Sequence, residues 1–142
     1  MKKISLFCDG SCLGNPGVGG WAYIVKFKEH EKKEFGSVSS TTNNQMELLA
    51  AIKGLRVLKE PCEVMLYTDS SYVANGLNSW LDNWVKKEFK KVKNEEYWKE
   101  LYRLKNYHKI TAIWVRGHSG HKENEECDTM ARNAALALQK EI

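Results

Sequence analysis

The chain opens with the stretch that decides its fold, Ile4-Ser5-Leu6-Phe7-Cys8-Asp9-Gly10-Ser11-Cys12-Leu13-Gly14-Asn15-Pro16-Gly17. The apolar run from Ile4 to Cys8 predicts a β-strand, and the Gly-, Asn- and Pro-rich residues after it indicate a turn. We therefore expect Asp9 at the end of the first strand. Asp-Gly pairs are common in turns, so this carboxylate alone does not indicate a functional site.

Two further strands are expected next. Residues Trp21 to Lys28 alternate with a period of two, and a turn near His30 would lead into a strand from about Lys32 to Ser39. Strands joined by short turns form an antiparallel meander.

A helix and a fourth strand follow. Thr42-Asn43-Asn44-Gln45 matches a capping box, and apolar residues recur at helical spacing until the chain approaches Pro61. Val64 to Tyr67 is continuously apolar, which is typical of a central strand covered on both faces.

The second half is predicted to be mostly helical. Residues 72 to 107 are expected to form helical segments with a break near Gly76 to Ser79. Ile110 to Val115 predicts a last strand, Arg116 to His121 a loop, and the pattern from about Glu125 a final helix. This order predicts an α/β fold in residues 1–142 as one domain: a mixed five-stranded sheet, antiparallel and then parallel, with helices on both faces.

Four carboxylates are expected to converge on this sheet. Asp9 and Asp69 each follow a strand whose end lies where ligands gather in such sheets. Glu47 and Asp128, in the first turns of covering helices, can be brought to the same crevice. Ordinary alternatives remain, because Asp69 can cap a helix that begins at Ser70 and the helix dipole favours acids in a first turn.

Such a group of acids requires a cation, because like charges in a poorly screened crevice repel strongly. Oxygen ligands favour Mg²⁺ or Mn²⁺, and a pair of these ions stabilises both oxygens of an in-line displacement at phosphorus. A zinc site of His118, His121 and Cys127 is disfavoured, because the chain offers no Cys-x-x-Cys pair or fourth ligand at the usual spacing.

The excess positive charge of the chain lies in one segment, residues 86–93, named here the lysine segment. It contains one glutamate, Glu88, and five lysines, Lys86, Lys87, Lys90, Lys91 and Lys93. Its charge of +4 equals the net charge of the whole chain. A lysine run is often only a solvated helix face. The neighbouring Trp80, Trp84 and Phe89 instead favour contact with a nucleic-acid backbone.

Composition excludes several classes of protein. With 42% hydrophobic and 28% charged residues the chain is not of the disordered class, and no apolar run is long enough to cross a membrane. Met1-Lys2-Lys3 is followed at once by a strand and not by a signal sequence. We expect a cytoplasmic monomer whose four cysteines are reduced.

A set of motifs stands in order along nearly the whole chain. They are Asp9-Gly10-Ser11, Asn15-Pro16-Gly17, Thr42 to Glu47, Thr68-Asp69-Ser70, Trp114 to His121 and Asn124 to Asp128. Together they resemble the cellular ribonuclease H family, type 1, in its bacterial single-domain form. The resemblance implies an endonuclease that hydrolyses the RNA strand of RNA/DNA hybrids, largely independently of sequence, and leaves 5′-phosphate and 3′-hydroxyl ends.

The resemblance also implies roles for the acids and one histidine. Asp9 would bridge two Mg²⁺ ions, with Mn²⁺ as an alternative metal. Asp128 would help to hold the ion that activates the attacking water, and Glu47 with Asp69 the ion that faces the leaving oxygen. His118 would assist proton movement or product departure, for which a near-neutral imidazole is suited.

The implied substrate-binding residues are amides, aromatics and lysines: Asn15, Asn43, Asn44, Trp80, Trp84, Lys86, Lys87, Lys90 and Lys91. Carboxamides can donate to and accept from a 2′-hydroxyl, although turn and cap formation is their ordinary role. The chain departs from the family where Ser71 replaces a frequent glutamine and Phe89 a usual tryptophan, and its basic segment looks shorter. We expect no separate hybrid-binding domain before Met1, so any processivity would depend on the lysine segment.

Two other functions remain open at this point. A non-catalytic nucleic-acid-binding module would keep the lysines and aromatics but would be expected to lose at least one acid, and all four are present. A resolvase or transposase core would use similar chemistry on DNA but would be expected to carry additional DNA-binding segments.

Overall fold

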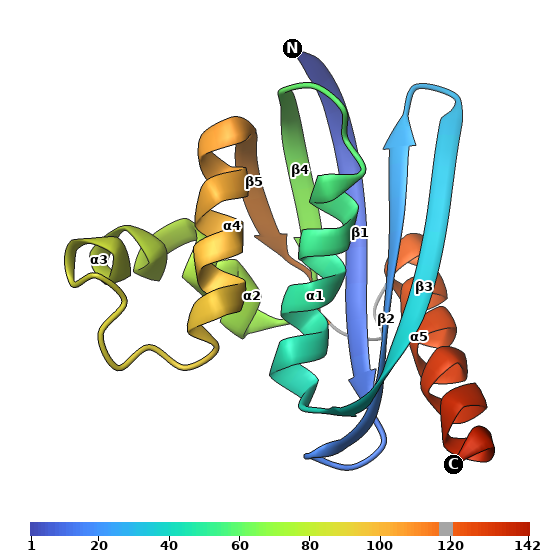
Figure 1. Cartoon of the computed structure of the whole chain (residues 1–142). Helices are drawn as coiled ribbons and strands as arrows, with labels where there is room; N and C mark the ends of the chain where they lie inside the picture. Colours follow the sequence, from blue (N-terminus) through green and yellow to red (C-terminus); the bar gives the residue numbers. More distant parts are fainter. Residues whose placement is uncertain (117–120) are drawn as a thin grey trace.

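A mixed five-stranded sheet forms the centre of the molecule (Figure 1). The structure, a computed structural model, describes residues 1–116 and 121–142. In sequence order the strands are β1 (Lys2–Cys12), β2 (Gly17–Phe27), β3 (His30–Thr41), β4 (Cys62–Thr68) and β5 (Lys109–Trp114). They lie in the spatial order β3-β2-β1-β4-β5, antiparallel from β3 to β1 and parallel from β1 to β5. The predicted fold class is confirmed.

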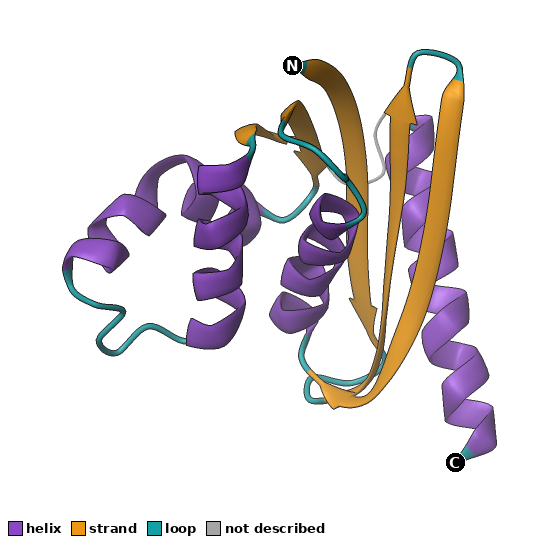
Figure 2. Ribbon diagram, turned by 45° about the horizontal axis from the view of Figure 1, so that its top comes forward, coloured by secondary structure: helices purple, strands orange, loops and turns teal. Residues whose placement is uncertain are grey.

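Helices cover both faces of the sheet (Figures 1 and 2). They are α1 (Asn43–Arg56), α2 (Ser71–Asn75), the π-helical turn η1 (Gly76–Trp80), α3 (Leu81–Lys86), α4 (Glu95–Tyr107) and α5 (Lys122–Glu141). The alternation predicted in β2 separates the two faces: Tyr23 packs with the core under α1 and α4, whereas Ile24 packs with Ala131 of α5. A period-two strand between two helical layers buries both of its faces in this way.

β1 is longer than predicted. It continues past Cys8 to Cys12, because residues 9–12 pair with residues 19–22 of β2 and stay extended despite their turn-forming composition. Its parallel pairing with β4 ends at Phe7 and Tyr67. Asp9 therefore lies inside β1, just beyond the point where the pairing of β1 with β4 ends.

The predicted break near Gly76 to Ser79 is a π-helical turn that separates α2 from α3, and not a non-helical interruption. The chain stays helical there through η1, and Gly76 allows close packing, since a Cβ at this position would stand closer than 3.0 Å to the Trp98 ring. The chain leaves the helical conformation after Lys86 instead. From Lys87 onward the lysine segment is thus a loop and not a helix face.

Two smaller corrections concern the layers over the sheet. α5 begins at Lys122 and not near Glu125, which places Asp128 in its second turn. β4 is fully covered only on its α1 side: Met65 and Tyr67 on the other side are half-buried, because α5 packs mainly against β1, β2 and β3.

No helix within the described residues is both long enough and apolar enough to cross a bilayer. The four cysteines form no disulfide.

Candidate active site

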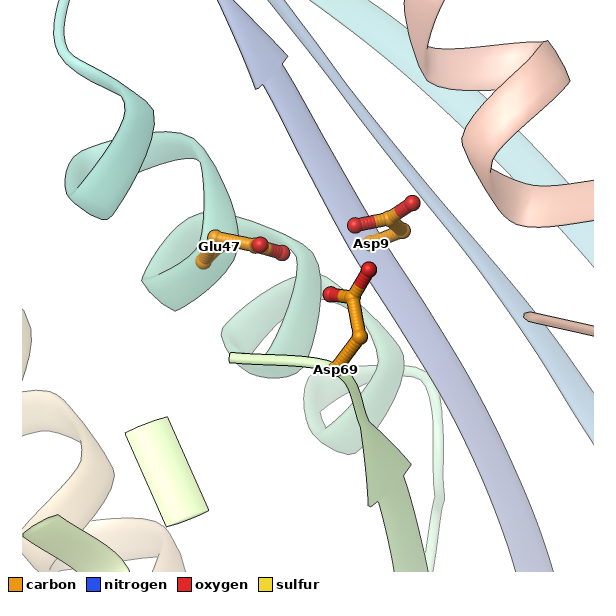
Figure 3. Close-up of side chains that lie close together, drawn as sticks. All are labelled: Asp9, Glu47 and Asp69. Atoms are coloured by element: carbon orange, nitrogen blue, oxygen red, sulfur yellow. The ribbon is translucent and has the colours of Figure 1, made fainter. Parts of the chain in front are cut away.

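Three of the four predicted acids meet at one point (Figure 3). Asp9 from β1, Glu47 from α1 and Asp69 after β4 point toward one another, and a carboxylate oxygen of each lies within 4.8 Å of the others. Asp9 and Glu47 are buried, and Asp69 is half-buried. This group is called the three-acid cluster below.

One main-chain group links two of these acids. The N–H of Gly10 lies 2.7 Å from Glu47 Oε1 and 2.9 Å from Asp9 Oδ1. α1 is started by Thr42, whose hydroxyl accepts from the N–H of Gln45 at 3.2 Å, so the first half of the predicted capping box is formed. Glu47 therefore projects from a helix end that is fixed against β1.

Asp69 is not a helix cap. Ser70 caps α2, because its hydroxyl accepts from the N–H of Val73 at 3.1 Å. The main-chain oxygen of Asp69 accepts from Trp114 Nε1 at 3.0 Å, a contact that sequence reasoning missed. Helix capping therefore does not explain this acid, and its carboxylate belongs to the three-acid cluster.

Asp128 lies beside the cluster but outside its closest contacts. It is half-buried on α5, directly after Cys127, whose thiol is buried against the sheet. Its charge is near enough to contribute to the raised pKa of Asp9. His118 lies outside the described residues.

Burial makes the cluster electrostatically costly. Burial first, and then repulsion from Asp69, raises the pKa of Asp9 from its usual 3.8 to about 8. Burial and then repulsion from Asp9 raise the pKa of Glu47 well above its usual range. None of the ion pairs between described residues includes a member of the three-acid cluster. A cation would relieve this repulsion.

The cluster fits a hard divalent cation. Its donors are all carboxylate oxygens, which suit Mg²⁺ and Mn²⁺ better than zinc. In addition, Asp69 Oδ1 is buried without a hydrogen-bond partner among the described residues. A buried acceptor of this kind is rare in proteins unless an ion or water satisfies it.

We predict that Mg²⁺ stabilises the protein more strongly at pH 8 than at pH 5. Between about pH 4 and pH 8, Asp9 is protonated in the metal-free folded state and ionised in the unfolded state, because its pKa is raised on folding. The stability of the metal-free protein therefore falls as the pH rises through this range. Mg²⁺ competes with that proton. Urea unfolding in saturating Mg²⁺ and in EDTA, from pH 5 to 8, measures the difference, which should reach about 3 kcal/mol when Mg²⁺ is at roughly 100 times its Kd.

His108 titrates in the same range. Because burial lowers its pKa from 6.5, it reduces stability as pH falls below that value, but it does so with and without Mg²⁺ and so cancels in the difference. KCl at equal ionic strength is the control. A KCl effect as large as that of Mg²⁺ at every pH would exclude a metal site.

Of the predicted amides, Asn15 lies in the turn between β1 and β2, and Asn43 and Asn44 are the first two residues of α1. Asn15 Oδ1 accepts from the main-chain N–H of Asn43 at 3.0 Å and so joins the β1–β2 turn to the start of α1. Asn15, Asn43 and Asn44 are all exposed. The structure therefore gives Asn15 its ordinary turn role and also leaves a row of exposed amides.

The lysine segment projects away from the sheet beside α3 (Figure 1). Lys86, Lys87, Lys90 and Lys91 are exposed, whereas Phe89 is 7% exposed and belongs to the core. Phe89 therefore anchors the loop and is not available for stacking on a base.

The two tryptophans differ in exposure. Trp84 is half-buried between Trp80 and Trp98, at ring distances of 5.8 and 5.0 Å, while Trp80 is 39% exposed. Of the two, Trp80 offers the larger free surface.

Asn94, which sequence reasoning missed, connects the lysine segment to the acid side of the molecule. Its Oδ1 accepts from Gln45 Nε2 at 3.2 Å, and its Nδ2 donates to the hydroxyl of Tyr72 at 3.2 Å. Gln45 lies two residues before Glu47 on α1. The only local signal for Asn94 was its place just before a helical pattern, where asparagine is frequent.

Comparison with known proteins gives consistent matches over the chain. A family model described as RNase H matches residues 1–136. The chain is 62% identical over 141 residues to a ribonuclease H of Campylobacter concisus (strain 13826), covering 99% of this chain and 98% of that protein. It is 50% identical over 142 residues to a ribonuclease HI of Helicobacter pylori (strain ATCC 700392 / 26695), covering 100% and 97%. The crystal structure of LC9-RNase H1, described as a type 1 RNase H with the type 2 active-site motif, superposes with a TM-score of 0.87 at 29% identity and covers 96% of this chain and 73% of that chain.

Proposed function

Because the chain belongs to the ribonuclease H family, we propose that it hydrolyses the RNA strand of RNA/DNA hybrids with two Mg²⁺ ions. The reaction is an in-line attack of water on phosphorus that leaves 5′-phosphate and 3′-hydroxyl ends, and Mn²⁺ is the alternative metal. The observation that carries the proposal is the three-acid cluster, in which two buried carboxylates and one half-buried carboxylate lie within 4.8 Å of one another, and none of them joins an ion pair between described residues.

The carboxylates divide the task of holding the ions. Asp9 would contribute to holding both ions, Glu47 and Asp69 would help to hold the ion that faces the leaving oxygen, and Asp128 would help to hold the ion that activates the attacking water. When bound, the ions supply Lewis-acid stabilisation of the charge that develops on both oxygens. His118, outside the described residues, moves a proton or assists product departure.

The hybrid is bound by two exposed groups. Asn15, Asn43 and Asn44 contact the minor groove and a phosphate, because amides can pair with a 2′-hydroxyl in both directions. Trp80, Trp84 and the lysine segment bind the duplex beyond the cut site. Recognition by shape, phosphates and hydroxyls makes cleavage largely independent of sequence. We expect a cytoplasmic monomer acting as one domain.

Neutralising the lysine segment should weaken hybrid binding and its salt dependence. A variant with glutamine at Lys86, Lys87, Lys90 and Lys91 loses four exposed cations. Because each lost phosphate contact lowers the slope of log K against log salt by roughly 0.9, the slope should fall by up to about 3 to 4. Fluorescence anisotropy of a labelled hybrid, titrated at several KCl concentrations, measures this.

The matched control neutralises four exposed lysines near the end of the sheet that is opposite to the three-acid cluster: Lys2, Lys3, Lys28 and Lys59. It changes the net charge equally and should leave the slope nearly unchanged. Equal losses in the two variants would mean that net charge, and not the lysine segment, determines affinity.

The proposed function is tested with matched duplexes. RNA/DNA, DNA/DNA and RNA/RNA of one sequence are incubated with the protein and Mg²⁺, and the products are resolved with end-group analysis. Cleavage confined to the RNA of the hybrid is the expected result. Cleavage of DNA would support a DNA-acting enzyme, and binding without cleavage a non-catalytic module.

A further inference from the structure

The N-terminal part of α5 is attached to the sheet just before Asp128. Asn124 Nδ2 donates a hydrogen bond to the main-chain oxygen of Tyr67 at 3.2 Å. Cys127 Sγ, a weak donor, lies 3.5 Å from the main-chain oxygen of Phe7. Phe7 and Tyr67 are the last paired residues of β1 and β4. The helix is therefore held at the point where these two strands separate.

The acids converge directly beyond this point. Asp9 and Asp69 each lie two residues past Phe7 and Tyr67, the last residues that pair β1 with β4. Asp128 stands four positions after Asn124, and side chains at this spacing lie one above the other on the same face of a helix. The position of Asn124 on β4 thus determines where Asp128 stands relative to the other carboxylates.

Asn124 makes the polar attachment of α5 to β4. Apolar packing through Cys127 and Ala131 involves β1 and β2, with the half-buried Tyr67 of β4 beside it, and the ring of His121 lies 5.9 Å from that of Tyr67. Within residues 1–116 and 121–142, the bond from Asn124 is the one hydrogen bond that joins α5 to β4. Ring and apolar contacts with Tyr67 are not directional, so without the amide hydrogen bond the helix can shift along β4 and displace Asp128 relative to Asp69.

The orientation of the amide follows from its neighbours. With the opposite orientation, the Asn124 oxygen would face the carbonyl oxygen of Tyr67, and two acceptors would repel. Asn124 Oδ1 is buried without a partner among the described residues. A surface cap would expose this oxygen to water, so the buried amide is better explained by its contact with β4.

We propose that Asn124 is a positioning residue for the reaction, acting through Asp128. Its bond to Tyr67 fixes the fourth carboxylate at the distance from the three-acid cluster that binding of the divalent cation requires. The inference rests on the proposed function, because Asp128 is taken there as a metal ligand.

The test measures Mg²⁺ affinity in two ways, by the concentration that half-saturates hydrolysis and by the stabilisation of the folded protein in urea. Asn124→Ala removes the amide, and Asn124→Leu removes it while keeping the volume, in case the alanine variant folds poorly. Both should raise the half-saturating Mg²⁺ concentration by about 10- to 100-fold, the usual effect of losing a group that orients a ligand. Glu123→Gln is the matched control, because it weakens a contact of the same turn, to Lys26 Nζ at 2.8 Å, that lies away from β4.

A double-mutant cycle with Asp128→Asn distinguishes positioning from general stability. If Asn124 acts through Asp128, replacing Asn124 in the Asp128→Asn background should leave the stabilisation by Mg²⁺ in urea unchanged. The same fold-change in both backgrounds, or unchanged Mg²⁺ affinity in the Asn124 variants, would overturn the inference. If the wild type cuts no hybrid but the cycle still shows coupling in the unfolding measurement, the proposed function fails and the positioning role stands.

Discussion

Replacing Asp9 with asparagine is expected to lower hydrolysis of an RNA/DNA hybrid by at least roughly 10³-fold. Asp9 is a buried member of the three-acid cluster, with carboxylate oxygens of Glu47 and Asp69 within 4.8 Å of its own. Removal of one preorganised electrostatic group that is not a metal ligand typically costs about 10² to 10³-fold, so a bridging ligand should cost more. Single-turnover cleavage in saturating Mg²⁺ measures this.

The same variant should be more stable than the wild type in the absence of metal. Asp9 is 3% exposed, and burial with nearby acids raises the pKa of its carboxyl group to about 8. A neutral amide of the same shape removes that repulsion, and we expect a gain on the order of 1–3 kcal/mol in the free energy of unfolding at pH 8. Urea unfolding in EDTA gives the value, and added Mg²⁺ should reduce the difference.

Asp82→Asn is the matched control. Asp82 lies on α3 with a side chain 77% exposed, and its nearest cation is Lys105 Nζ at 3.8 Å. Both the rate and the stability of this variant should stay close to the wild type. If Asp9→Asn kept hydrolysis within about tenfold of the wild type, Asp9 would not be a metal ligand in the reaction.

The acids of the site could be predicted because local patterns mark them. Asp69 follows a short apolar run, and Glu47 stands beside the apolar stripe of a helix with a recognisable start. The exact place of Asp9 in its strand could not be predicted, because the extension of β1 depends on pairing with β2. Tertiary pairing there outweighs the turn preference of glycine and serine.

The contacts that orient the acids were not predictable from the sequence. Trp114 binds the main chain of Asp69 across 45 residues, and Gln45 binds Asn94 across 49. A hydrogen bond between residues so far apart in the sequence leaves no local pattern from which it could be predicted. The lysine segment was likewise assigned to helices, although Glu88, Phe89 and other residues near it adopt positive φ. Burial of Phe89 in the core gives a reason for this irregular path.

Replacing Gly10 with alanine is expected to damage both stability and activity. β1 and α1 approach each other so closely at Gly10 that a Cβ there would stand closer than 3.0 Å to main-chain atoms of Met46 and Glu47. These atoms can move only if α1 moves as a unit. The free energy of unfolding should fall by about 3 kcal/mol, the upper range for overpacking in a core.

The loss of activity should exceed what the lower stability explains. Moving α1 away from β1 displaces Glu47 and weakens the bond from the Gly10 N–H to Glu47 Oε1, now 2.7 Å. A displacement of about 1 Å at a reacting group can cost roughly 10²-fold in rate. The rate should therefore fall by about that factor even at a temperature where circular dichroism shows the variant to be fully folded.

Gly36→Ala provides the comparison for this prediction. Gly36 lies on β3, the edge strand, and the nearest atoms to an added Cβ belong to the ring of the half-buried Trp21, a side chain and not the main chain of a helix. We expect a stability change below about 1 kcal/mol, since alanine also restricts the unfolded chain, and an unchanged rate. Full activity in folded Gly10→Ala would mean that Glu47 tolerates displacement, and that close contact between β1 and α1 serves the core and not the reaction.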